Sequence, residues 1–227
     1  MDLNAFVLVL AVFIFQMIVL YFVSHTMINE LYYLLYGIFK KKETAFSIIA
    51  FLLLPGTIVH EMSHFLMATI LFLPVREIRI FPEWRQNNVR LGMVSYQKAD
   101  IIRSVIIGIA PFFGAIGFFI LIEAFGLFPT NHFVLNICMG YLICMISANM
   151  FSSKQDLVDL IYLVPIIIVF LTLYYLLNIK IMVTVPSEFI QKGTVILKSI
   201  NFYITIALAV HLGVIILFKS FRSLFQR

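Results

Sequence analysis

Charged residues are scarce in this chain. Only 12% of its 227 residues are Asp, Glu, Lys or Arg, whereas 63% are hydrophobic. One soluble domain of this length has too little interior to bury so much apolar surface, so the sequence is that of a membrane protein. The chain also lacks a soluble segment or a low-complexity linker beside its apolar runs. We therefore expect a single integral membrane domain over residues 1–227, embedded in a lipid bilayer.

Cysteine is almost absent too. Cys138 and Cys144 are six residues apart within one apolar run. That spacing suits neither a metal site nor a disulfide staple, so we interpret both as ordinary buried thiols. The opening stretch lacks the basic start and the small-residue cleavage site of a signal peptide, and we expect it to be retained as a span.

Long apolar runs dominate the rest of the sequence. A spanning helix needs about 20 apolar residues. The runs predict an all-α polytopic protein with about six transmembrane helices, at 5–23, 44–73, 101–127, 133–150, 157–177 and 200–218. The second is long enough to tilt or to be broken at Pro55-Gly56. The apolar piece at 30–39 is half a span long and is typical of an interfacial or re-entrant segment.

The net charge of +5 comes from basic residues in the loops. In a membrane protein, such residues indicate the topology and contacts with anionic lipid headgroups rather than binding of nucleic acid. We expect no nucleic-acid partner. Lys40, Lys41 and Lys42 favour a cytoplasmic position for the loop before the second span. A larger basic group favours the opposite side, and six spans cannot place both groups inside. Following the larger group, we expect both termini in the cytoplasm; its members are Arg76, Arg79, Arg85, Arg90, Lys98, Lys219, Arg222 and Arg227.

One motif carries chemistry. His60-Glu61-Met62-Ser63-His64 has the H-E-x-x-H pattern within the second predicted span. Residues four apart share a helix face, so His60 and His64 can bind one Zn²⁺ while Glu61 reaches the attacking water. Glutamate can take a proton from that water and hand it to the leaving amine. The pattern predicts a zinc-dependent metalloendopeptidase.

The bilayer strengthens this interpretation. The pattern arises by chance in roughly a few sequences per thousand. Each titratable group within a span costs about 2.5–3.5 kcal/mol to insert into the bilayer. Three such groups lie within the five residues of the motif, so they need a partner, and a metal ion provides one. A polar contact between helices without a metal is the alternative.

A catalytic zinc site needs a third protein ligand. Asp156 and Asp159 lie where the fourth predicted span ends and the fifth begins. In a bundle of alternating spans, this junction is on the same side as the end of the second span. Either aspartate can supply the ligand, or each can be an acid at a helix N-terminus, favoured there by the helix dipole.

These elements resemble the site-2 protease family of intramembrane zinc metalloproteases. Residues 50–160 match the family in the order and spacing of elements, although Ser152 replaces its proline and no glycine follows the aspartate. The resemblance implies that His60, His64 and Asp156 bind zinc, that Glu61 is catalytic and that Asn149 matches the family's asparagine. It implies a catalytic core at about 44–177, with the spans 5–23 and 200–218 as additions, and a transmembrane protein or peptide as substrate.

The loop after the second span predicts a membrane-associated β-hairpin. Residues 75–81 and 89–96 alternate partly like strands, and Pro82 and Asn87-Asn88 favour turns between them. An exposed edge could pair with a melted substrate segment, or the basic hairpin could lie on headgroups. Asn149 could donate to the substrate carbonyl or the developing oxyanion, or make an interhelical hydrogen bond.

Other functions remain open from the residues. A peptidase with its zinc outside the bilayer would need a soluble domain for which this chain has no segment. A zinc transporter or a substrate-binding scaffold is the alternative, but a transporter would often show an internal repeat, which we do not find, and has no need of Glu61. We expect a multi-pass protein of a prokaryotic plasma membrane.

Overall fold

The computed structural model describes residues 3–81, 83–85, 88–90, 92–97, 100–151, 168–169, 172–173, 176 and 186–225. Helices make up most of this part of the chain, and four short strands form two small antiparallel sheets. The predicted helical class with a small β-hairpin is confirmed, and long apolar helices support the membrane part of the prediction.

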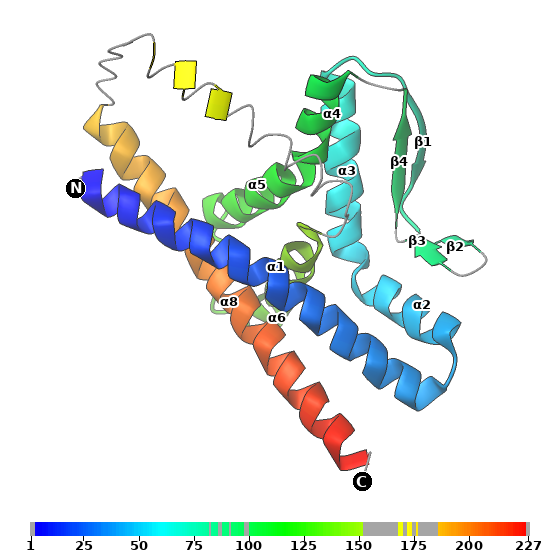
Figure 1. The fold of residues 1–227 in the computed structure, drawn as a ribbon. Coiled ribbons are helices and arrows are strands. Elements are labelled where there is room, and N and C mark those ends of the chain that lie inside the picture. Colours follow the sequence, from blue (N-terminus) through cyan, green and yellow to red (C-terminus); the bar gives the residue numbers. More distant parts are fainter. Residues whose placement is uncertain are drawn as a thin grey trace.

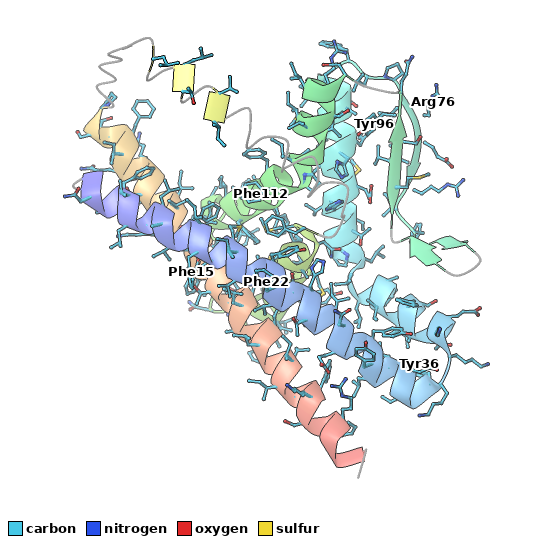
Figure 2. All side chains as sticks on the ribbon, in the orientation of Figure 1. Phe15, Phe22, Tyr36, Arg76, Tyr96 and Phe112 are labelled. Carbon is cyan, nitrogen blue, oxygen red and sulfur yellow. The ribbon has the colours of Figure 1, made fainter. Side chains whose placement is uncertain are left out.

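Two long helices, α1 (Leu3–Phe39) and α8 (Ser187–Phe225), pack side by side along the molecule (Figure 1). Each contains 36 residues that are apolar enough to span a bilayer. Such a stretch is about 54 Å long, which exceeds the ~30 Å hydrocarbon core. Large apolar side chains cover the outward-facing surface of these helices, among them Phe15 and Phe22 of α1, which are 67% and 63% exposed (Figure 2). This surface suits contact with lipid.

Both long helices extend beyond their predicted bounds. Residues 30–39 continue α1, so the prediction of a separate interfacial or re-entrant piece is wrong. The hydroxyls of Ser24 and Thr26 donate to the carbonyls of Tyr21 and Phe22, so the helix continues through these polar residues. At the other end of the chain, α8 begins at Ser187 rather than at residue 200.

The two long helices run parallel. The Gln16 amide donates to the Thr205 hydroxyl at 2.8 Å, and the Arg222 guanidinium lies 3.3 Å from the Glu30 carboxylate. These contacts advance in the same direction along both sequences. Apolar packing fills the region behind them, where Leu20, Ile204 and Ala207 are fully buried together with Phe119 and Ile143 of other helices.

Parallel packing bears on the number of crossings. Among six spans that alternate in direction, the first and the last run antiparallel. Because α1 and α8 run parallel, the total number of spans must be odd if both helices cross the bilayer. The described residues contain two candidate spans, or up to four if each bent helix pair counts as one, and a count of six is not confirmed. Most of the fifth predicted span, 157–177, lies outside the described residues.

The same packing brings together basic residues from the two groups that the sequence predicts on opposite sides. Lys40 follows the last residue of α1, and Lys219 and Arg222 lie in the last turns of α8. Because the helices are parallel, these residues gather at one end of the pair, where Lys40 and Arg222 line the same pocket. If both helices cross a bilayer, these basic residues share one side of it.

The predicted second and third spans are each a bent pair. α2 (Lys42–Leu52) and α3 (Leu54–Ile70) meet at 69°, so the break predicted at Pro55-Gly56 is confirmed and lies at Leu53. α4 (Ile101–Gly108) and α5 (Ala110–Ala124) meet at 41°, directly before Pro111. Proline cannot donate to the carbonyl four residues earlier, which explains breaks at both places. α6 (Phe133–Asn149) follows as a shorter apolar helix, in which Cys144 is buried but Cys138 is exposed, unlike the prediction.

The predicted hairpin is present as two nested pairs. β1 (Val75–Arg79) pairs with β4 (Met93–Tyr96), and β2 (Glu83–Arg85) pairs with β3 (Asn88–Arg90), all antiparallel. Residues 80 and 81 lie outside the strands. β1 and β4 lie along α3, which places the base of the hairpin beside the H-E-x-x-H helix (Figure 1).

Candidate active site

The three residues of the motif lie in the middle of α3. α5 and α6 pack against this helix, and the hairpin lies along it. His60 and Glu61 are only 5% and 8% exposed, and His64 is half-buried. Polar groups buried this deeply need partners, because desolvation without them costs several kcal/mol. The contacts of the two imidazoles show how this requirement is met.

Each imidazole is held through its Nδ1 atom by a backbone carbonyl. His60 Nδ1 donates to the Asn149 carbonyl and His64 Nδ1 to the Ile107 carbonyl, both at 2.9 Å. A carbonyl can only accept, so the proton of each neutral ring resides on Nδ1. Metal-binding histidines are commonly oriented by such a bond from the ring nitrogen that does not bind the metal.

Both carbonyls are available because a helix ends or breaks there. Asn149 is the last residue of α6, where carbonyls lack an intrahelical donor. Ile107 lies four residues before Pro111, and proline has no N–H to donate to it. The same feature that bends α4 against α5 therefore provides the acceptor for His64.

The two Nε2 atoms face each other at a distance of 3.2 Å. With protons on both Nδ1 atoms, each Nε2 presents a lone pair, and two lone pairs this close repel unless a cation or a proton lies between them. Two nitrogen ligands of a tetrahedral zinc, each ~2.0–2.1 Å from the metal, are about 3.3 Å apart. The donor set of His60 and His64 thus fits zinc.

Glu61 is covered by the backbone at the base of the hairpin. A Cβ atom added to Gly92 would lie 2.6 Å from Glu61 Oε1 and 2.7 Å from its Cγ. Any residue larger than glycine would therefore collide with the carboxylate or move it. Gly92 directly precedes β4, so strand β4 and the motif glutamate are in contact at this point.

Two more glycines bring the neighbouring helices close to α3. A Cβ at Gly56 would lie 2.2 Å from the Met145 carbonyl oxygen of α6, and one at Gly114 would lie 1.9 Å from the Ser63 hydroxyl oxygen. Glycine at both positions lets the backbones approach closely, as in other membrane helix pairs. This proximity brings the Asn149 and Ile107 carbonyls within reach of the histidines.

Asn149 is 2% exposed and contacts the site in an unexpected way. Its backbone carbonyl holds His60, whereas its side-chain amide donates to the carbonyls of Met145 at 2.9 Å and Leu53 at 3.4 Å. The interhelical bond to Leu53 matches the structural alternative considered for this residue. A role at the substrate carbonyl stays a prediction.

The third metal ligand is the part of the site that the structure does not test. Asp156 and Asp159 both lie outside the described residues. Within the described part of the chain, no group of three or more His, Cys, Asp or Glu side chains is arranged to hold a metal ion. Among other acids, Glu123 accepts a hydrogen bond from Tyr203 at 2.7 Å, and Glu30 is paired with Arg222.

Two contributors to the site were missed in the sequence. The signal for the Ile107 carbonyl is Pro111 four residues later, inside the predicted span at 101–127. The signal for Gly92 is a glycine inside a strand-like stretch, which often marks a close backbone approach. Neither signal identifies the histidine or the glutamate that makes the contact.

Comparison with known proteins adds no identification. The sequence matches no protein-family model, and neither a curated protein nor a solved structure is significantly similar to it.

Proposed function

We propose that this protein is an intramembrane zinc metalloprotease that resembles the site-2 proteases and hydrolyses peptide bonds in or beside transmembrane segments. The observation that carries the proposal is the pair of Nε2 atoms 3.2 Å apart, with each ring held through Nδ1 by a carbonyl. Glu61 follows His60 directly in the same buried helix, among helices of membrane type. The full count of transmembrane spans and a prokaryotic plasma membrane remain part of this proposal.

Each residue has a distinct role in the proposed reaction. His60, His64 and Asp156 hold zinc, which when bound supplies the Lewis acidity that activates water and polarises the peptide carbonyl. Glu61 takes a proton from the attacking water and returns it to the leaving amine. Its burial beside the Gly92 backbone keeps the carboxylate in one position, which lowers the entropic cost of bringing it to the attacking water.

A transmembrane substrate must unwind before hydrolysis, because helical carbonyls are hydrogen-bonded and shielded. The hairpin offers a partner for the extended substrate chain. β1 and β4 form a two-stranded sheet, in which each strand pairs with the other along one of its two edges. A substrate strand added to an open edge would lie along α3, close to Glu61.

The decisive experiment combines metal analysis with cleavage. Protein reconstituted in vesicles with a mixture of synthetic single-span peptides is compared with Glu61→Gln and with Glu43→Gln, whose exposed carboxylate lies in α2. We expect all three to contain about one zinc per chain and Glu61→Gln alone to lose cleavage, by at least a hundredfold. Full cleavage by Glu61→Gln would contradict the proposal. Zinc in all three proteins with cleavage by none of them would favour a zinc transporter or a substrate-binding scaffold.

The third ligand is tested by zinc content. Asp156→Asn should lower the zinc affinity at least tenfold, as should His60→Ala, because each removes a ligand that must bind deprotonated. Asp159→Asn and His132→Ala, which replaces an exposed histidine at the start of α6, serve as matched controls. Loss of zinc in Asp159→Asn but not in Asp156→Asn would reassign the ligand.

A further inference from the structure

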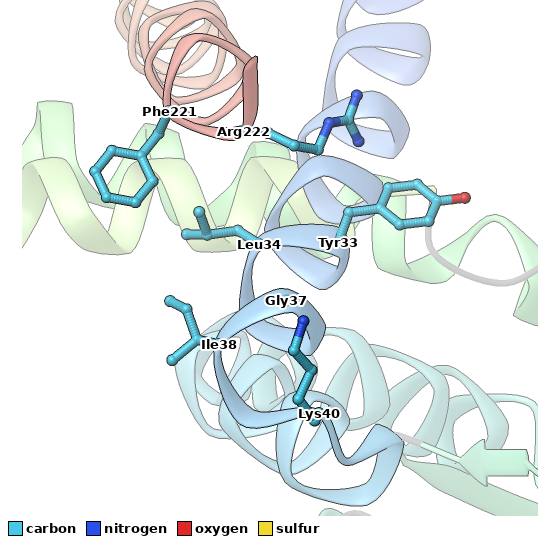
Figure 3. A pocket seen from close by; sticks show the side chains of 7 residues that line it. All are labelled: Tyr33, Leu34, Gly37, Ile38, Lys40, Phe221 and Arg222. Atoms are coloured by element: carbon cyan, nitrogen blue, oxygen red, sulfur yellow. The ribbon is translucent and has the colours of Figure 1, made fainter. Parts of the chain in front are cut away.

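A groove opens between the C-terminal parts of the two long helices, and none of its lining residues belongs to the H-E-x-x-H motif. It has a volume of about 580 Å³. Tyr33, Leu34, Gly37, Ile38 and Lys40 line it from α1, and Phe221 and Arg222 line it from α8 (Figure 3). The groove therefore combines aliphatic and aromatic walls with two cationic groups.

The end of the helix pair around this groove is strongly basic. Lys40, Lys41 and Lys42 are exposed in succession, and Lys219 is exposed one turn before Arg222. Among the residues that the structure describes, the acids at this end are Glu30, which is paired with Arg222 at 3.3 Å, and exposed Glu43. Positive charge remains in excess here, so an anion is the complementary ligand. Clusters of this kind at the end of membrane helices attract anionic lipids at about 1 kcal/mol per basic residue.

Arg222 is already positioned at the groove. Its guanidinium lies 5.5 Å from the centre of the Tyr33 ring and also contacts Glu30. These two contacts fix the side chain, so less entropy is lost when its remaining N–H groups meet a ligand. Leu34, Ile38 and Phe221 extend the surface with apolar groups, of which Ile38 and Phe221 are 59% and 44% exposed.

We propose that this groove binds an anionic phospholipid, with the phosphate at Lys40 and Arg222 and an acyl chain against Leu34, Ile38 and Phe221. A phosphate alone would leave the apolar walls exposed, and a neutral lipid would leave the charge of Lys40 uncompensated. The anionic phospholipid satisfies both parts of the groove. A lipid bound there would also contact both parallel helices, at the end where their side chains leave a cavity between them.

The test compares lipids on the purified full chain in detergent by native mass spectrometry. Phosphatidylglycerol should bind at least fivefold more tightly than phosphatidylcholine. Lys40→Gln should lower the phosphatidylglycerol affinity about fivefold, which is the equivalent of one basic residue. Lys192→Gln, an exposed lysine near the start of α8, should have no effect.

A second variant fills the groove without altering charge. A Cβ at Gly37 meets no atom within 4 Å, so a larger residue begins there without a clash, and Gly37→Leu adds its side chain to the lining of the groove. It should reduce phosphatidylglycerol binding at least fivefold, whereas Gly213→Leu, at an equally open glycine of α8, should not.

The proposal would be overturned by equal binding of the two lipids, by equal effects of Lys40→Gln and Lys192→Gln, or by displacement of the lipid by millimolar inorganic phosphate. A dimer that Gly37→Leu converts to a monomer would likewise overturn it and assign the groove to a second copy of the chain.

Discussion

The imidazoles of His60 and His64 obtain their orientation from residues on other helices. Their Nδ1 atoms are fixed by carbonyls 89 and 43 residues away in sequence, which leaves both Nε2 atoms directed at one point. An imidazole without such a bond rotates about its side-chain torsions and loses affinity for a metal. At this scale the site depends as much on Asn149 and Ile107 as on the histidines.

Gly92 gives a prediction at the same scale. Gly92→Ala would place a methyl group 2.6 Å from Glu61 Oε1, so the carboxylate or the hairpin must shift. We expect zinc content to stay unchanged while peptide cleavage in vesicles falls at least tenfold, because a displacement of about 1 Å can cost a hundredfold in rate. Gly140→Ala, which meets open space in α6, is the control. Unchanged cleavage by Gly92→Ala would show that the hairpin moves away from Glu61 before reaction.

The breaks within helices are the main functional feature at the level of elements. Pro55 lies in the first turn of α3 and Pro111 in the first turn of α5. Each break leaves carbonyls that other groups can use: Tyr141 donates to the Leu52 carbonyl at 2.6 Å, and His64 donates to that of Ile107. A straight helix would bond these carbonyls internally and offer none to the site.

Replacement of Pro111 tests this link. Pro111→Ala supplies an N–H that competes with His64 for the Ile107 carbonyl. We expect the zinc affinity to fall about tenfold, in the range found when partners of metal-binding histidines are lost. The melting temperature should not fall, because alanine favours the helix. Titration with a competing chelator measures the affinity, and an unchanged value would mean that the carbonyl does not control the histidine.

The contact between α3 and α5 is tested by two glycines of the same helix. Gly114→Ala would place its methyl group 1.9 Å from the Ser63 hydroxyl oxygen, whereas Gly117→Ala meets no atom within 4 Å. We expect Gly114→Ala to destabilise the protein by about 1–3 kcal/mol through overpacking. Gly117→Ala should be neutral or stabilising by about 0.5–1 kcal/mol. Thermal unfolding in detergent compares them, and equal melting temperatures would contradict the close approach.

Parallel packing of α1 and α8 sets the arrangement of the whole molecule. Polar contacts at both ends of the pair fix its register, from the Asn201 amide on the Val9 carbonyl at 3.0 Å to Arg222 on Glu30. Hydrogen bonds between membrane helices contribute about 0.6 kcal/mol each on average, so several are needed to fix one register. The basic ends of both helices consequently lie together at one end of the pair.

This arrangement predicts opposite sides for the two ends of the pair. In a variant without Cys138 and Cys144, single cysteines are placed at Asn4 and at Lys219, both of which are exposed. A membrane-impermeant maleimide added to intact cells should label Asn4→Cys and not Lys219→Cys, since the lysine-rich end is cytoplasmic. Labelling of both or of neither would support an even number of crossings.

The sequence by itself determined the local features of this protein: the helix with its four-residue histidine spacing, the break near Pro55-Gly56 and the hairpin after α3. Each follows from interactions among neighbours in the chain, namely helical periodicity, the missing proline N–H and strand alternation. Only the tertiary structure decided which carbonyls hold His60 and His64, that Gly92 covers Glu61 and that α1 runs parallel to α8. These contacts join residues between 31 and 192 positions apart, and no local preference encodes which distant backbone or side chain will be the partner.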